Sequence, residues 1–248
     1  MSSESESNES KMVELARSLA DPLRLAILEQ LMGGPATVSE LVALSGSTQS
    51  NVSNHLAVLR DGGLVRASSL GRQKVYELSG ASVARLVEAL VAVSGGLSPA
   101  RPTTAGIAQA RTCYDHLAGR LGVALFAALV NRSAIEPPAP TDAEVGRDRG
   151  ALALGPDGEG VFRALGVEID EARRERRNFA SYCIDWTERS PHLSGALGAA
   201  LWRRFLETGW VVREPGTRGV IVTRSGKGQL RRLLAIDVDS LEGDAGGD

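Results

Sequence analysis

The sequence predicts a mainly helical protein with small β-hairpins, an α+β fold class, divided into two domains. Its 248 residues suit two domains better than one large domain. The composition, 43% hydrophobic but only 4% aromatic, is typical of helices that pack through small and aliphatic side chains. Residues 96–104, GLSPARPTT, have the composition of a linker with little to bury. We therefore expect domains at 11–95 and 105–240.

The two ends of the chain are expected to be disordered tails. Residues 1–10, MSSESESNES, are acidic, and they and residues 241–248 contain too little apolar surface to fold. The sequence shows neither a signal peptide nor an apolar run long enough to span a membrane, so we expect a soluble cytoplasmic protein. In that compartment the two cysteines are expected to be free thiols.

Local signals define the elements of the first domain. Asp21 and Pro22 suit the start of a helix, which Gly33-Gly34-Pro35 ends. Ser47 follows a short turn and is a candidate N-cap for the next helix. The expected elements are helices near 12–19, 22–32, 38–44 and 48–60, strands near 64–69 and 73–78, and a helix at 82–93.

The helix expected at 48–60 has two contrasting faces. At 100° per residue, Leu56 and Leu59 fall within 40° of Val52, so this stripe should pack inward. The opposite side carries only small or hydrogen-bonding residues, namely Ser50, Ser53, Asn54 and Ala57. A helix with such a face fits the major groove of duplex DNA, where asparagine pairs with adenine and serine serves several bases.

A helix-turn-helix followed by a basic hairpin, or wing, is an arrangement that reads duplex DNA. The weak net charge of −2 does not exclude DNA, because only the contacting face must be positive. The wing should bring its arginine and lysine to phosphates or to the minor groove. The residues expected to contact DNA are Ser47, Thr48, Gln49, Ser50, Asn51, Ser53, Asn54, His55, Arg60, Arg72 and Lys74.

Each of these features also has a purely structural interpretation. The polar face of 48–60 could be the solvated side of an ordinary helix, and the wing could be a basic turn that aids solubility. His55 lies 60° from the packed stripe, and an internal hydrogen bond is as good an explanation for it as a base contact.

The second domain gives weaker signals. Ile107, Tyr114, Leu117, Leu121 and Leu125 predict one long helix at 105–131. Further on we expect a strand at 151–154, helices at 160–165, 171–178 and 193–208, a hairpin that turns at Pro215-Gly216, and a helix at 225–234. This last part repeats the order helix, glycine, strand, turn, strand, helix of the first domain, which allows a second winged-helix-like unit.

Residues 11–95 resemble the ArsR/SmtB family of bacterial winged-helix regulators. The resemblance rests on three segments in order, LADPLRLAILEQL, SELVALSGSTQSNVSNHLAVLRDGGLV and GRQKVYEL. It implies a homodimeric repressor of transcription that binds a pseudo-palindromic operator. In that family the first and last helices form the dimer interface, here 11–20 and 82–94, and the helix at 48–60 is the recognition helix.

The chain departs from that family where relatives bind metals. Thr37 and Ser39 stand at the positions of the arsenic-type cysteines, and 82–94 offers only Glu88 as a zinc ligand. We therefore expect no metal at the usual family positions, and we look for the effector in the C-terminal extension.

Two segments of the extension, ARTCYDHLAG and YCIDWTERSPHL, hold side chains that can bind an effector. On the predicted long helix, Cys113 and His116 would share a face. The candidate effector or thiol site comprises Cys113, Tyr114, His116, Cys183, Asp185, Trp186 and His192. This mixed donor set suits a soft metal, a metalloid or thiol chemistry.

Two other interpretations of these segments stay open. The cysteines could be small buried hydrophobes and the histidines locally hydrogen-bonded. Alternatively, four aromatic residues could line a pocket for a small-molecule effector, namely Tyr114, Trp186, Trp202 and Trp210.

The leading hypothesis is a ligand-responsive DNA-binding repressor without enzymatic activity. One alternative is a thiol-dependent enzyme fused to a winged helix, although the sequence contains no glycine-rich phosphate loop and no nucleophile elbow. Another is a structural DNA-binding module, in which a basic cluster contacts flanking DNA through Arg213, Arg218, Arg224 and Lys227.

The two parts of the DNA-reading surface should separate by mutation. Asn54→Ala should change the base preference of binding, because it removes a base-edge contact worth about 1–3 kcal/mol of discrimination. Arg72→Ala should weaken binding to all sequences and flatten its salt dependence. Affinity measurements on matched and mismatched duplexes at several salt concentrations would check this, and equal loss of discrimination in both variants would contradict it.

Overall fold

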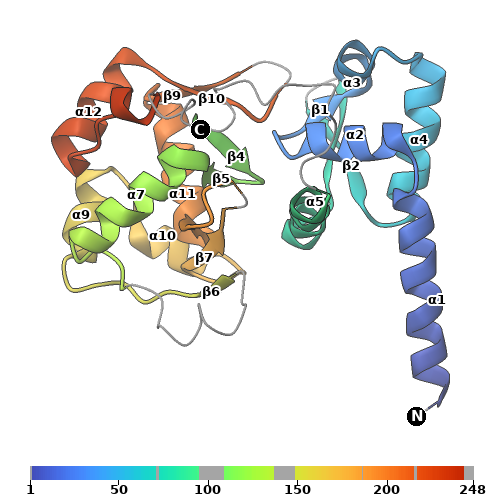
Figure 1. The fold of residues 1–248 in the computed structure, drawn as a ribbon, viewed down its shortest axis with the longest axis horizontal. Coiled ribbons are helices and arrows are strands. Elements are labelled where there is room, and N and C mark those ends of the chain that lie inside the picture. The colour runs from blue at the N-terminus through green and yellow to red at the C-terminus, as the bar shows by residue number, and fades with distance from the viewer. Residues whose placement is uncertain are drawn as a thin grey trace, which may run out of the picture. The chain divides into compact units, whose positions relative to one another are not determined.

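In the computed structural model the chain divides into two compact units, Met1–Leu97 and Ser98–Asp248 (Figure 1). The structure describes residues 2–70, 73–94, 109–136, 149–185, 187–214 and 217–242. None of the described helices combines the length and the apolar content needed to cross a bilayer.

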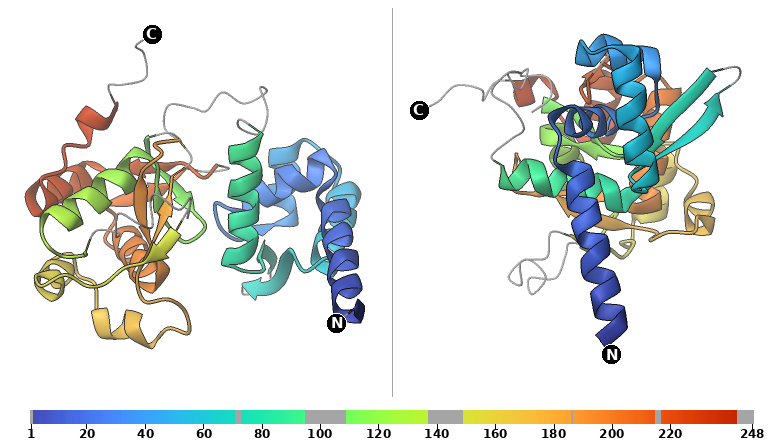
Figure 2. Two further views of the ribbon diagram at one scale, coloured as in Figure 1. Left: turned by 60° about the horizontal axis from the view of Figure 1, so that its bottom comes forward. Right: turned by 90° about the vertical axis from the view of Figure 1, so that its right-hand side faces the viewer.

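The first unit is a winged helix-turn-helix, as the sequence predicted. Its elements are α1 (Ser2–Leu19), α2 (Pro22–Leu31), β1 (Ala36–Thr37), α3 (Val38–Ser45), α4 (Gln49–Asp61), β2 (Val65–Leu70), β3 (Gln73–Leu78) and α5 (Ala81–Val93). The strands form an antiparallel sheet in the order β1-β3-β2, with Tyr76 opposite both Ala36 and Ala67. Strands β2 and β3 extend as a hairpin beyond α4 (Figure 2).

Side chains and one glycine fix the helix ends around the turn. The Asp21 carboxylate accepts hydrogen bonds from the backbone N–H groups of Leu23 and Arg24 at 2.9 and 3.0 Å, which satisfies two free donors of α2. Thr37 and Glu40 form a reciprocal capping box at the start of α3. Gly46 ends α3 in the left-handed region, with φ 65°, and directs the chain into α4.

The N-cap of α4 is Thr48, not Ser47 as we expected. The Thr48 hydroxyl accepts from the backbone N–H of Asn51 at 3.3 Å, and the helix begins at Gln49. The Ser47 hydroxyl instead accepts from the Asn51 side-chain amide at 3.0 Å. Both residue types are good caps, so sequence alone cannot choose between neighbours one position apart.

The N-terminal segment also differs from the expectation. Residues 1–10 were expected to be disordered, but α1 already includes Ser2 and runs to Leu19. Acidic residues are favourable near the N-terminus of a helix, which lets the amphipathic segment that starts at Lys11 extend backwards. Two apolar side chains of this helix, Met12 and Val13, are 65% and 48% exposed.

The second unit is made of short antiparallel sheets and helices. Its elements are β4 (Arg111–Cys113), β5 (His116–Ala118), α7 (Gly119–Asn131), β6 (Arg149–Ala151), α9 (Gly158–Ala164), α10 (Ile169–Arg174), β7 (Ser181–Ile184), β8 (Pro191–Ser194), α11 (Gly195–Glu207), β9 (Val211–Arg213), β10 (Val220–Val222), α12 (Arg224–Leu234) and a 3-10 turn, η1 (Asp239–Glu242). The turn η1 includes Leu241 and Glu242 of the expected tail, and 243–248 lie outside the described residues.

The single long helix expected at 105–131 is wrong. Residues 111–118 form the hairpin β4–β5, and only α7 is helical after it, while 105–108 lie outside the described residues. Tyr114 turns the chain in the left-handed region, with φ 63°, and Gly119 does so again at φ 73° before the helix. Leu117 of the hairpin keeps helical spacing with Leu121 and Leu125 of α7, so the sequence pattern did not reveal where the hairpin ends and the helix begins.

The winged-helix order expected near the C-terminus is present in part. Helix α11, strands β9 and β10, and helix α12 follow one another as predicted, while the turn at Pro215-Gly216 lies outside the described residues. However, a hairpin and not a helix-turn-helix precedes α11. This region therefore lacks the paired helices that define a DNA-reading winged helix.

A hairpin followed by a helix occurs twice in the second unit, as β4–β5–α7 and β7–β8–α11. Both copies contain Cys-x-Asp and then His-Leu-x-Gly-x-Leu-Gly-x-Ala-Leu, at 116–125 and 192–201. Each helix packs against the strand of the other copy, α7 on β8 and α11 on β5. A Cβ on Gly122 or Gly198 would lie 2.6 or 2.7 Å from the carbonyl oxygen of Leu117 or Leu193, respectively, so glycine lets each helix start close against its own hairpin.

The assignment of the α4 cap can be tested by two alanine variants. Thr48→Ala should destabilise the first unit by about 1 kcal/mol, because it removes the acceptor for a free helix N–H. Ser47→Ala keeps that acceptor and should leave stability within about 0.5 kcal/mol of the parent. Urea unfolding followed by far-UV circular dichroism measures both, and a larger loss for Ser47→Ala would reverse the assignment.

Candidate functional site

The fourth helix presents the two faces that its spacing predicted. Val52, Leu56 and Leu59 are completely buried against the first unit. Three small polar residues of the opposite face, Ser50, Ser53 and Asn54, are exposed. These three side chains can form hydrogen bonds and are neither bulky nor acidic.

The flanking candidates are also mostly at the surface. Gln49 and Asn51 are exposed at the start of α4, and Arg60 is exposed near its end, paired with Asp61 at 3.0 Å. On the wing, Lys74 is exposed and its ammonium lies 5.4 Å from the centroid of the Tyr76 ring. Arg72 lies outside the described residues.

His55 points away from the exposed face of α4. Its Nδ1 lies 3.5 Å from the Asp21 carboxylate that caps α2, and 18% of its side chain is exposed. The backbone N–H of Arg24 lowers the pKa of Asp21, and nearby His55 adds to this effect. His55 therefore lies beside the start of α2, although its Nδ1 makes no hydrogen bond to the described residues.

In the second unit, the hairpins bring distant effector candidates together. Cys113 is directly opposite His116 in β4–β5, and Cys183 is directly opposite His192 in β7–β8. Facing residues of antiparallel strands project to the same side of the sheet. The rings of His116 and His192 stack, with centroids 5.1 Å apart, although 76 positions separate them in sequence.

The donor atoms of this cluster lie within metal-binding range of one another. One side-chain donor atom from each of Cys113, His116 and His192 lies within 4.8 Å of the others. The Cys183 thiol is within hydrogen-bonding reach of Cys113 and His116. The two histidines are only 6% and 2% exposed, whereas both cysteines are half-buried, so the sulfur side is the more accessible one.

A carboxylate accompanies each histidine. Asp115 Oδ1 lies 3.3 Å from His116 Nδ1, and Asp185 Oδ2 lies 3.6 Å from His192 Nδ1. Asp185 is fully buried and accepts from Arg111 at 2.6 Å and from the backbone N–H of Gly119 at 2.7 Å.

Arg177 binds the carboxylate beside His116 as Arg111 binds the one beside His192. Its guanidinium lies 2.5 Å from the Asp115 carboxylate. We did not single out Arg111, Asp115 or Arg177 from the sequence, yet the Cys-x-Asp pattern repeated at 113–115 and 183–185 was a signal for Asp115.

The electrostatics of the cluster favour a thiolate beside a protonated imidazole. Hydrogen bonding from Cys113 lowers the pKa of the Cys183 thiol, burial opposes this, and His116 lowers it further. Burial opposes protonation of His116, but Asp115 and Cys183 raise its pKa to about 9. Burial and the neighbouring His116 charge lower the pKa of His192 to about 4. A thiolate and a neutral imidazole are the forms that bind metal ions, so His192 is already in its metal-binding form, whereas an ion would have to displace a proton from His116.

The carboxylates of the cluster are held ionised. Burial alone would raise the pKa of Asp185, but the Arg111 guanidinium and neighbouring donors keep it well below its usual value. Asp115 is likewise lowered by His116 and Arg177 against the effect of burial. The cluster can therefore hold two negative carboxylates behind its histidines.

The aromatic candidates that the structure describes, Tyr114, Trp202 and Trp210, lie in separate settings. Trp202 is buried in the hydrophobic core, and the Trp210 ring lies 4.9 Å from that of Phe205. Tyr114 forms the left-handed turn of β4–β5, and Trp186 lies outside the described residues.

The basic cluster expected near the C-terminus does not form one exposed surface. Arg218 is buried, and the Arg213 guanidinium lies 5.0 Å from the centroid of the Trp202 ring. Lys227 is half-buried and ion-paired with Asp239, whereas Arg213 and Arg224 are exposed. This arrangement does not favour the structural alternative in which these residues bind flanking DNA together.

Comparisons with known proteins agree with this architecture. The family described as "Bacterial regulatory protein, arsR family" matches residues 21–67. A protein of Bacillus subtilis (strain 168), described as an uncharacterized HTH-type transcriptional regulator, YdfF, is 34% identical over 92% of this chain and 98% of its own length. This chain belongs to the ArsR family. As an ArsR-family regulator it is a bacterial DNA-binding regulator of transcription, and the extent of the match includes the second unit.

Shorter relatives match the first unit of the regulator. CmtR of Mycobacterium bovis, an HTH-type transcriptional regulator, is 43% identical over 40% of this chain and 85% of its own length. A solution structure of the homodimeric winged helix-turn-helix domain of Mb0332, also from Mycobacterium bovis, is 32% identical over 38% of this chain and 87% of that one, with a TM-score of 0.36.

Proposed function

We propose that this regulator is a homodimeric repressor that binds a pseudo-palindromic operator and leaves it when an effector, or a thiol modification, acts on the second unit. The observation that carries the proposal is the assembly of Cys113, His116, Cys183 and His192 inside the second unit, outside residues 21–67 that the family model matches. A reactive cluster joined to a DNA-reading unit is the arrangement that an effector-controlled regulator needs.

The polar face of α4 supports the DNA-reading part of the proposal. Ser50, Ser53 and Asn54 have the donors and acceptors that base edges recognise, and a fully buried apolar stripe holds the helix in place behind them. We propose that α4 enters the major groove and that the wing, through Lys74 and Arg72, contacts the backbone beside it.

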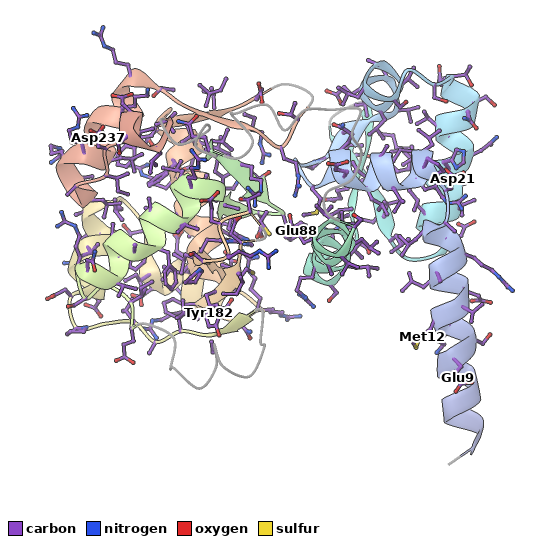
Figure 3. The ribbon with its side chains drawn as sticks, viewed as in Figure 1. Glu9, Met12, Asp21, Glu88, Tyr182 and Asp237 are labelled. Carbon is purple, nitrogen blue, oxygen red and sulfur yellow. The ribbon has the colours of Figure 1, made fainter. Side chains whose placement is uncertain are left out.

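Exposed apolar residues on the first and last helices of the first unit support dimerisation. Met12 projects from a part of α1 that no other described element of the first unit covers (Figure 3), and Val13 is 48% exposed on the same helix. Val93, at the end of α5, is 89% exposed. A second copy of the chain would cover such side chains, and a dimer places two recognition helices about one DNA turn apart.

Release from the operator requires a minimum coupling free energy between effector binding in the second unit and DNA binding in the first. To change an operator from almost fully occupied to almost empty, the effector must favour the released form by about 5.5 kcal/mol. A single contact seldom supplies that much, whereas bonds to several side chains at once can. A cluster of four donor side chains meets this requirement.

The dimer interface can be tested by one charge substitution and a matched control. Val13→Glu should shift the protein towards monomer and weaken operator binding, because a carboxylate would be buried against the partner copy. Val212→Glu, on β9 of the second unit, changes a valine of similar exposure, 43%, and should leave the dimer intact. Sedimentation velocity gives the masses, and a parent protein that is already monomeric would contradict the proposed dimer.

The role of the thiols can be tested on DNA from the gene's own upstream region. The parent protein should lose affinity for this DNA when treated with the thiol oxidant diamide or with Zn²⁺. A variant with both Cys113→Ser and Cys183→Ser should bind DNA normally but resist release by either reagent, because it lacks both sulfur atoms. Gel-shift titrations measure this, and unchanged release of the double variant would dismiss the thiols as sensors.

A further inference from the structure

We infer that the second unit binds one zinc-class cation between its two hairpins, with Cys113, His116, Cys183 and His192 as the ligands. The inference deepens the proposed function, because it names the chemical class of the effector at that cluster. It rests on the proposed function only for its effect on DNA, since ion binding can be measured without DNA.

The spacing of the donors fits one tetrahedral ion after a small contraction. One donor atom from each of Cys113, His116 and His192 already lies within 4.8 Å of the others. Zinc bonds of about 2.3 Å to sulfur and about 2.0 Å to nitrogen place tetrahedral ligands roughly 3.3–3.8 Å apart. Side-chain rotations that move these donor atoms by about an ångström would bring them to that spacing. Cys183 does not belong to this closely spaced group of three, but it lies opposite His192 in β7–β8 and within hydrogen-bonding reach of Cys113 and His116, so we infer that it moves in as the fourth ligand.

Buried nitrogen atoms without hydrogen-bond partners point into this cluster. Both ring nitrogens of His192 are buried and make no hydrogen bond to the described residues, and Nε2 of His116 is buried within reach of the Cys183 thiol. Buried polar atoms are normally satisfied, and exceptions often mark a missing ion or a functional site. A cation at the centre of the cluster would satisfy Nε2 of both rings at once.

The residues behind the histidines are those that support metal ligands. Asp115 Oδ1 lies within hydrogen-bonding distance of His116 Nδ1, at 3.3 Å, so Nε2 of that ring is the atom left for an ion. Asp185 Oδ2 lies 3.6 Å from His192 Nδ1, which is an electrostatic contact and not a hydrogen bond. Such carboxylate–histidine pairs orient the ring and raise its basicity in metal sites. Arg177 and Arg111 in turn hold the two carboxylates in position.

The donor types select the class of ion. Two sulfur and two imidazole ligands suit zinc-class d¹⁰ ions, whereas magnesium and calcium require oxygen ligands. Two thiolates also neutralise the charge of a divalent ion. The half-buried cysteines leave an entry route on the sulfur side, while the histidine side is closed.

The duplication explains how one ion could connect the two copies. Each hairpin contributes one cysteine and one histidine, so an ion joins β4–β5 to β7–β8. Strand β4 is also the first described strand after α5 along the chain. A change in the packing of the two hairpins would therefore involve β4, which follows the proposed dimer helix α5 in sequence.

Cobalt provides a direct test on the reduced full-length protein. Titration with Co²⁺ should give about one equivalent per chain, with the ligand-field bands of a tetrahedral site and a sulfur-to-cobalt charge-transfer band. Cys113→Ser and His192→Gln should weaken binding by more than about 100-fold, and Asp115→Asn by about 10–100-fold. His55→Gln removes the chain's third histidine, which lies in the other unit, and should change neither band nor stoichiometry.

A measurement on the unaltered protein keeps the test valid if a variant fails to fold. One equivalent of Zn²⁺ should protect both cysteines from alkylation by iodoacetamide, and EDTA should restore their reactivity. Lack of protection, or Co²⁺ spectra unchanged in Cys113→Ser and His192→Gln, would overturn the site. Protection without any effect on operator affinity would leave the ion site in place and overturn its role as the effector site.

Discussion

The stacked rings of His116 and His192 are the contact on which the second unit depends. They join two hairpins that are distant in sequence, and both rings are buried. Asp185, itself fully buried, is stable there only because Arg111 and backbone donors surround it. The neighbouring strands and helices therefore form around a polar centre as well as an apolar core.

The first unit could be predicted from sequence because its signals are local. The Asp21 cap, the turn at Gly46 and the inward stripe of Val52 each lie within a few residues of the element they define. What sequence missed there was small in scale, such as the choice of Thr48 over Ser47 as a cap. DNA contact by the outward side chains of α4 stays a prediction, since the structure places these side chains but contains no DNA.

The second unit was harder to predict because its organisation is non-local. Leu117, Leu121 and Leu125 keep helical spacing, and nothing within that window reveals that Cys113 pairs across a strand with His116. Five of the seven candidate residues, Cys113, His116, Cys183, Asp185 and His192, nevertheless come together, while their role as an effector site stays a prediction. Comparing 113–125 with 183–201 would have revealed the repeat, and with it the second carboxylate, Asp115.

The repeat has a consequence for how this chain can change over time. In a symmetric pair of identical chains, one substitution alters both halves of a shared centre together. Here the halves lie in one polypeptide, and they already differ: Asp115 and His116 are adjacent, whereas six residues separate Asp185 from His192. Each hairpin can thus change independently, so a substitution can alter the histidine or the cysteine of one hairpin while the other hairpin keeps its own.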